Sequence, residues 1–170
     1  LQCLDQIAER LTVGIVEAHQ NAVGFQNFAA HFLFGNILAR QIPTGFATDW
    51  MMNDPFEGMR NALNAMRLRT GDPNALSCEQ ALWLHTMGAA RVLGLDAEIG
   101  SLEPGKKADL IVVDLDRPHL QPYYGGYSAL VYYAKSSDVE TSIVDCEVVL
   151  EAGRPTRLDE SAALSAIAGH

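Results

Sequence analysis

Apolar side chains recur at helical spacing between residues 54 and 94. The clearest pattern opens at Asp54, which a proline follows, and closes at Gly71. An acidic cap before proline and a final glycine are typical start and stop signals of a helix. A second helix is predicted from Ser77, with Gln80 completing a capping box, to Gly94.

Short β-branched or apolar runs predict strands, and they divide the chain into two parts. Before residue 94, strands alternate with helices: we expect strands at 12–18 and 42–48, and further helices at 2–11 and 25–39. After it the chain is β-rich, with predicted strands at 108–114 and 142–150, a turn at 151–154 and a short helix at 160–168. We therefore divide the chain into 1–94, 95–158 and 159–170.

The run 42–48 ends next to the residue of greatest chemical interest, Asp49. A carboxylate at the carboxyl end of a buried strand is where an α/β enzyme usually places its chemistry. Asp49 is therefore the candidate catalytic residue. The plainer alternative is that it only caps a turn or the helix that follows.

Composition narrows the class of protein. The chain has 170 residues, of which 48% are hydrophobic, enough for one domain with a core. A net charge of −9 without acidic blocks argues against binding nucleic acid or anionic membranes. Three widely spaced cysteines suggest a reduced, cytoplasmic protein. No apolar run reaches about 18 residues, and the first residues resemble the middle of a helix rather than a signal peptide.

Several segments resemble one known family. Residues 87–96 and 99–114 resemble the C-terminal signature of the amidohydrolase superfamily, and 144–153 resembles its closing strand pair. Residues 45–60 are similar to the eighth barrel strand and following helix of the triazine hydrolase and aminohydrolase branch. That branch includes chlorohydrolases and cytosine, guanine and adenosyl-type deaminases. Residues 13–19 resemble the seventh strand less closely, because Gln20 and Asn21 follow His19 where the branch often has Cys-Pro.

The resemblance implies an α/β fold: the C-terminal part of a (β/α)8 barrel of a metal-dependent hydrolase, about strands 7 and 8 with their helices. Part of a flanking β-sandwich, built in the family from both chain ends, would follow. Barrels of this family hold one or two divalent metals through a His-x-His on the first strand, histidines on the fifth and sixth, and an Asp on the eighth. By resemblance Asp49 is that metal ligand and catalytic residue, while His19, Trp50 and Asn53 are expected on the substrate side.

The implied reaction is hydrolysis of a C–N or C–halogen bond of a small heterocyclic substrate. A zinc or iron ion would lower the pKa of its bound water to about 7. Asp49 would take the proton of that water and pass it to the leaving amine or halide. We also expect a homo-oligomer. Neither the substrate nor the metal is identified by the sequence.

The ligand set of such an enzyme is incomplete in this sequence. A whole barrel takes about 250 residues, and the 170 residues here contain no His-x-His. A catalytic zinc needs three protein ligands, so Asp49 alone would not hold one. We therefore expect a C-terminal fragment of a longer enzyme, with the metal bound by the full-length protein and none expected on this chain alone.

Two alternatives remain. The chain is either a non-catalytic truncated module that folds by association with another chain, or an unrelated small α/β binding domain in which Asp49 is only a cap. If 108–114 and 142–150 do not pair in one sheet, the family interpretation fails and the second alternative is favoured. Three other residues receive structural interpretations: we expect Lys106 and Lys107 in a solvated turn and Cys146 as a small core residue on a strand.

Overall fold

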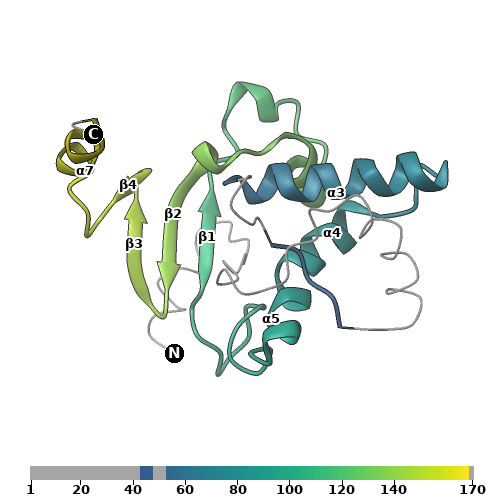
Figure 1. Ribbon diagram of the computed structural model, residues 1–170, viewed down its shortest axis with the longest axis horizontal. Coiled ribbons are helices and arrows are strands. Elements are labelled where there is room, and N and C mark those ends of the chain that lie inside the picture. The colour runs from purple at the N-terminus through teal and green to yellow at the C-terminus, as the bar shows by residue number, and fades with distance from the viewer. Residues whose placement is uncertain (1–42, 48–52, 169–170) are drawn as a thin grey trace.

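The computed structural model describes residues 43–47 and 53–168. Three helices, α3 (Pro55–Thr70), α4 (Cys78–His85) and α5 (Met87–Leu93), lie beside an antiparallel sheet (Figure 1). The elements predicted over 2–11, 12–18 and 25–39 lie outside the described residues. Of the strand predicted over 42–48, residues 43–47 are described and carry no regular secondary structure. None of the helices in the described ranges is long and apolar enough to span a bilayer.

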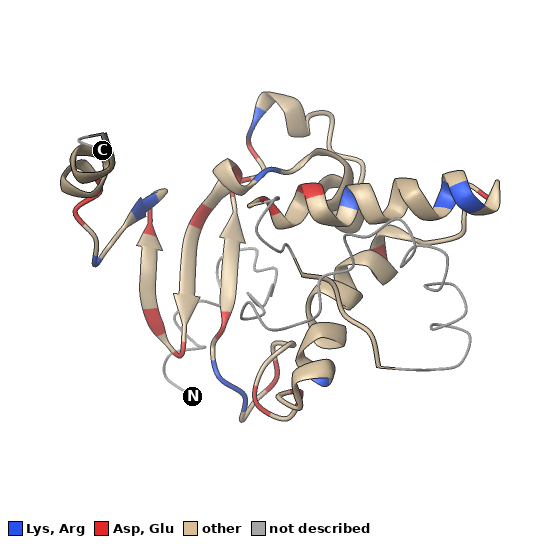
Figure 2. Cartoon of the chain, viewed as in Figure 1, with Lys and Arg blue, Asp and Glu red and all other residues tan. Residues whose placement is uncertain are grey.

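The caps of α3 form as predicted. The Asp54 side chain accepts hydrogen bonds from the amides of Phe56 and Glu57, at 2.9 and 3.3 Å. Gly71 ends the helix in the left-handed conformation, with φ 69°. Arg67 and Arg69 lie in the last turn of α3, where their positive charges interact favourably with the negative end of the helix dipole. In Figure 2 the ribbon of α3 is blue at the end where these basic residues lie, while acidic residues, in red, are spread over several elements.

The prediction of one helix from Ser77 to Gly94 is wrong in one respect: the structure has two helices, α4 and α5, in this range. The capping box between Ser77 and Gln80 forms as predicted, with both bonds near 3 Å (2.9 and 3.1 Å), and Gly94 closes α5 at φ 71°. Between them Thr86 has φ −110° and ψ −92°, which no α-helix contains. The break separates α4 from α5.

The sheet has four strands in the order β1 (Leu110–Val113), β2 (Val139–Val144), β3 (Glu147–Glu151) and β4 (Arg154–Pro155), each antiparallel to the next. Leu110 lies opposite Ile143 and Val112 opposite Thr141. The predicted segments 108–114 and 142–150 therefore pair in one sheet. This pairing is the result that the family interpretation requires.

The strand predicted over 142–150 is interrupted by a hairpin turn. Asp145 and Cys146 have φ values of 50° and 64°, as a two-residue hairpin with a type I′ turn requires. The Asp145 amide donates to the Asp109 carboxylate at 2.6 Å. Cys146 is exposed, so its placement in the core of a strand was wrong. The turn predicted at 151–154 is confirmed between β3 and β4.

Between β1 and β2 the chain forms four short helical turns that the sequence pattern did not predict: η1 (Pro118–Leu120), α6 (Gly126–Ser128), η2 (Ala129–Tyr133) and η3 (Ser136–Asp138). The final helix, α7 (Glu160–Ala168), forms over the predicted residues. In Figure 1 it lies at the β4 side of the sheet, away from α3–α5. The division of the chain near residue 94 stays a prediction.

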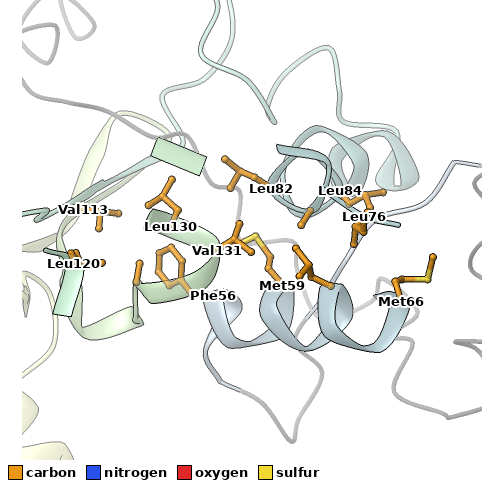
Figure 3. Packing of buried hydrophobic residues seen from close by; sticks show 13 residues of the cluster. Phe56, Met59, Met66, Leu76, Leu82, Leu84, Val113, Leu120, Leu130 and Val131 are labelled. Atoms are coloured by element: carbon orange, nitrogen blue, oxygen red, sulfur yellow. The ribbon is translucent and has the colours of Figure 1, made fainter. Parts of the chain in front are cut away.

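The main core lies between α3 and the elements packed on it. The apolar side chains that recur at helical spacing along α3 are buried against side chains of α4, η2 and β1 (Figure 3). They are Phe56, Met59, Leu63 and Met66. Burial of each large apolar side chain contributes about 1.5–3 kcal/mol. Hydrogen bonds fix the orientation of α3 on this core. The Arg60 guanidinium donates to the carbonyls of Val131 and Ala134, at 3.1 and 2.8 Å. Helix α3 is thus tied to the connection between β1 and β2.

Lys106 differs from the prediction of a solvated turn. Its side chain is only 11% exposed, and its Nζ donates to the Asp96 carbonyl at 2.6 Å and to the Ser101 hydroxyl at 2.7 Å. An ammonium group has three N–H donors, so it can bind several acceptors of one loop at the same time. Lys107 is exposed, as predicted, and forms an ion pair with Glu98 at 3.3 Å.

Candidate active site

The structure describes the two flanks of the predicted active-site segment. Asp49, Trp50 and His19 lie outside the described residues, so their assigned roles stay predictions. Asn53 is described: it is exposed and stands directly before Asp54, the cap of α3. Its assignment to the substrate side also stays a prediction.

The upstream flank, residues 43–47, packs against the junction of α4 and α5. The Phe46 amide donates to the Leu84 carbonyl at 2.9 Å. Thr44 is buried, with 7% of its surface exposed, and Phe46 packs on the edge of the main core. The residues that lead toward Asp49 are therefore held by both backbone and side chains.

The downstream flank is held by Asp54. One carboxylate oxygen caps α3, and the other accepts the Ser136 amide at 3.0 Å. A charged acceptor makes a stronger hydrogen bond than a neutral one. This single side chain thus fixes the start of α3 against the connection between β1 and β2.

The break at Thr86 explains the contact on the upstream side. In an uninterrupted helix, the Leu84 carbonyl would accept the amide four residues later, that of Gly88. The Thr86 hydroxyl instead donates back to the Leu82 carbonyl at 2.9 Å, and the backbone turns. The Leu84 carbonyl accepts the amide of Phe46.

His85 lies at this junction and was not assigned a function from the sequence. It is 5% exposed, and its Nδ1 is buried with no hydrogen-bond partner among the described residues. Burial lowers the pKa of His85 from 6.5 to about 4, because the charged ring loses its hydration. The side chain is therefore neutral at physiological pH.

A second histidine, His119, forms a hydrogen bond with a buried acid. Its Nε2 lies 2.8 Å from Oδ2 of Asp138, which is 2% exposed. The same oxygen accepts the Lys135 amide at 2.8 Å. The pair joins η1 to η3, and its partners are structural groups of the same connection.

The described residues do not form a metal site. Within 43–47 and 53–168, no group of three or more His, Cys, Asp or Glu side chains is placed to hold an ion. The sequence predicts one ligand, Asp49, whereas a catalytic zinc needs three from the protein. The donor set present does not fit a complete metal centre.

Comparison with known proteins identifies the family. The model of the amidohydrolase family matches residues 34–149 of this chain. The chain belongs to the amidohydrolase family. This confirms the resemblance found in segments 45–60, 87–96 and 99–114, and in residues 144–149 of the closing segment. In this amidohydrolase the match spans the upstream flank, α3 to α5 and most of the sheet.

Individual relatives add detail. A 5-methylthioadenosine/S-adenosylhomocysteine deaminase of Moorella thermoacetica is 49% identical over 90 residues, which are 53% of this chain and 21% of the relative. An adenosine deaminase structure from Xanthomonas campestris with bound zinc has a TM-score of 0.74 and 29% identity, over 80% of this chain and 32% of that one. The triazine hydrolase TrzN of Arthrobacter aurescens, with zinc, has a TM-score of 0.71 and 23% identity, over 80% and 31%. The chain therefore spans about a fifth to a third of the length of these proteins.

Proposed function

We propose that this amidohydrolase chain is the C-terminal portion of a metal-dependent deaminase that hydrolyses the exocyclic C–N bond of an adenosine-type nucleoside. The observation that carries the proposal is the 49% identity to a nucleoside deaminase, together with the likeness to a zinc-containing adenosine deaminase. We assign residues 1–94 to about strands 7 and 8 of the barrel with their helices, and 95–158 to the flanking sandwich.

A deaminase is favoured over a halogen-removing hydrolase. The triazine hydrolase shares 23% of its residues with this chain and therefore supports the fold alone. Fold does not determine the bond that is cleaved, because the same barrel supports many reactions. The more similar sequence belongs to an enzyme that acts on a C–N bond.

In the proposed enzyme, Asp49 contributes one carboxylate to the active site. A carboxylate both accepts a proton and binds a hard cation. The remaining ligands would come from residues that precede this sequence in a longer protein. Trp50, Asn53 and His19 are proposed to face the nucleoside, and the enzyme is proposed to be a cytoplasmic homo-oligomer.

The full-length protein that carries this sequence provides the test. Ammonia release is measured with 5′-methylthioadenosine, S-adenosylhomocysteine and adenosine, before and after removal of divalent metal by a chelator. We expect release with at least one nucleoside, its loss on chelation and its recovery on addition of zinc or iron. Absence of release from all three nucleosides with metal present would contradict the proposal.

The alternative of a non-catalytic truncated module is favoured by one observation, the single carboxylate of the predicted donor set. Metal analysis of the purified 170-residue chain addresses it directly. We expect no stoichiometric, tightly held metal. One equivalent of zinc or iron retained through dialysis would show that this chain contains a complete site, contrary to our account.

A further inference from the structure

We propose that the break between α4 and α5 positions the backbone that leads to Asp49, and that Gly88 is a positioning residue of the enzyme. The inference rests on the proposed function, because it assigns Asp49 to the active site. It goes beyond that function in naming a part of the fold, outside the barrel strand itself, on which activity depends.

The first step is the hydrogen bond across the junction. The Leu84 carbonyl is released from helical pairing by the turn at Thr86 and accepts the Phe46 amide at 2.9 Å. Phe46 stands three residues before Asp49 in the sequence. A backbone amide removed from water needs an acceptor, so this bond favours one position of segment 43–47 relative to α4 and α5.

The second step is the closeness of the two backbones. A Cβ on Gly88 would lie 2.7 Å from the Thr44 carbonyl oxygen, and a Cβ on Gly45 would lie 2.5 Å from the Ala89 Cα. Both neighbours are backbone atoms, which cannot rotate away as a side chain does. Any larger residue at position 88 must therefore displace the segment 43–47 or the start of α5.

The third step is that the loop after α5 also packs closely against α5. Gly100, at φ 96°, lies so close that a Cβ there would be 2.8 Å from the Ala90 Cβ and 3.2 Å from the Met87 Cα. The loop after α5 is further closed by Lys106, through its bonds to the carbonyl of Asp96 and the hydroxyl of Ser101. Because α5 is also confined by these contacts, we expect strain at position 88 to displace the segment 43–47.

The fourth step is the anchor on the other side of Asp49. Asp54 holds the start of α3 and the Ser136 backbone. The seven residues between Phe46 and Asp54 are thus attached at both ends to elements of the described core. We expect movement of either anchor to displace Asp49 as well, and misplacement of a catalytic group by about 1 Å costs about a hundredfold in rate.

The experiment compares Gly88→Ala with Gly58→Ala in the full-length protein. Gly58 lies within α3, and a Cβ there meets no atom within 4 Å, so Gly58→Ala is the matched control. We expect Gly88→Ala to lower kcat for nucleoside deamination by about tenfold or more, with KM changed less than about twofold. We also expect faster hydrogen exchange at the Phe46 amide, while the control keeps wild-type kcat and exchange.

Several results would overturn the inference. One is a Gly88→Ala enzyme that remains folded by circular dichroism and retains wild-type kcat per folded molecule. Another, which needs no variant, is a Phe46 amide in the wild-type protein that exchanges as fast as an unstructured peptide. Absence of deaminase activity in the wild type would instead refute the proposed function, and the positioning role with it. The activity of the wild type therefore distinguishes the two failures.

Discussion

His85 makes the stability of this chain dependent on pH, and His85→Leu should remove that dependence. The imidazole is buried in α4, its Nδ1 has no hydrogen-bond partner among the described residues, and burial lowers its pKa to about 4. The unfolded chain has the ordinary value of 6.5. As the pH falls below 6.5, the unfolded state binds a proton that the folded state does not.

The size of the effect follows from the two pKa values. Stability that is present above pH 6.5 is lost progressively down to pH 4, and His85 causes no further loss below that. Between pH 7 and pH 4.5 the loss is roughly 2–3 kcal/mol, since one pKa unit corresponds to about 1.4 kcal/mol. Leucine cannot bind a proton, so His85→Leu should be spared this loss. At pH 7 it should be at least as stable as the wild type, because a buried unpaired nitrogen is removed.

The assay is urea unfolding at pH 7 and pH 4.5, followed by far-UV circular dichroism. The quantity of interest is the stability difference between His85→Leu and the wild type, because other titrating groups cancel in it. Leu84→Ala is the control: this neighbour is also buried, and its loss of about 2–5 kcal/mol should be equal at both pH values. If the difference for His85→Leu is the same at both pH values, His85 is not a buried neutral histidine and the account of the junction is wrong.

Three further substitutions, tested by the same unfolding measurement, each remove one kind of stabilising interaction: a helix cap, the hydrogen bonds of Lys106 and a buried aromatic ring. Asp54→Ala should lower stability by about 1–2 kcal/mol through the lost cap, and more through the lost bond to Ser136; a change below about 0.5 kcal/mol would contradict this. Lys106→Met should cost about 1–3 kcal/mol because the hydrogen bonds of a mostly buried ammonium are lost, whereas Lys107→Met, at an exposed site, should have little effect. Phe56→Ala should cost about 3–5 kcal/mol, because this ring is fully buried; near-wild-type stability would show that it is not part of the core.

The features predicted correctly are those determined by a few neighbouring residues. The caps at Asp54 and Ser77 and the closing glycine at position 71 require only local hydrogen bonds or local backbone freedom. The final helix over 160–168 likewise follows from its own residues. Such signals are present in the chain whatever packs around it.

The features that were missed depend on distant residues. The break at Thr86 is accompanied by the bond from Phe46, 38 positions before Leu84, and a helical pattern with good caps contains no sign of it. The hairpin at Asp145 and Cys146 lacks the usual Asn-Gly or Asp-Gly signal, and it is held by the Asp109 carboxylate, 36 residues away.

The candidate site was only partly accessible from the sequence. The family could be recognised because its signature lies in continuous segments of this chain, and the family model confirms it over residues 34–149. The roles of Asp49, His19, Trp50 and Asn53 rest on the resemblance and stay predictions. A barrel collects its active-site residues from several strands, so a chain covering about a fifth of a relative includes few of them.

The most direct test of the central claim is ammonia release from 5′-methylthioadenosine by the full-length protein, with Asp49→Asn compared with the wild type. Asparagine keeps the size of the side chain but neither accepts a proton nor provides a charged ligand. The account predicts that the wild type releases ammonia and that the variant, with unchanged circular dichroism, is slower by about a hundredfold or more. An Asp49→Asn protein that releases ammonia at the wild-type rate would contradict it.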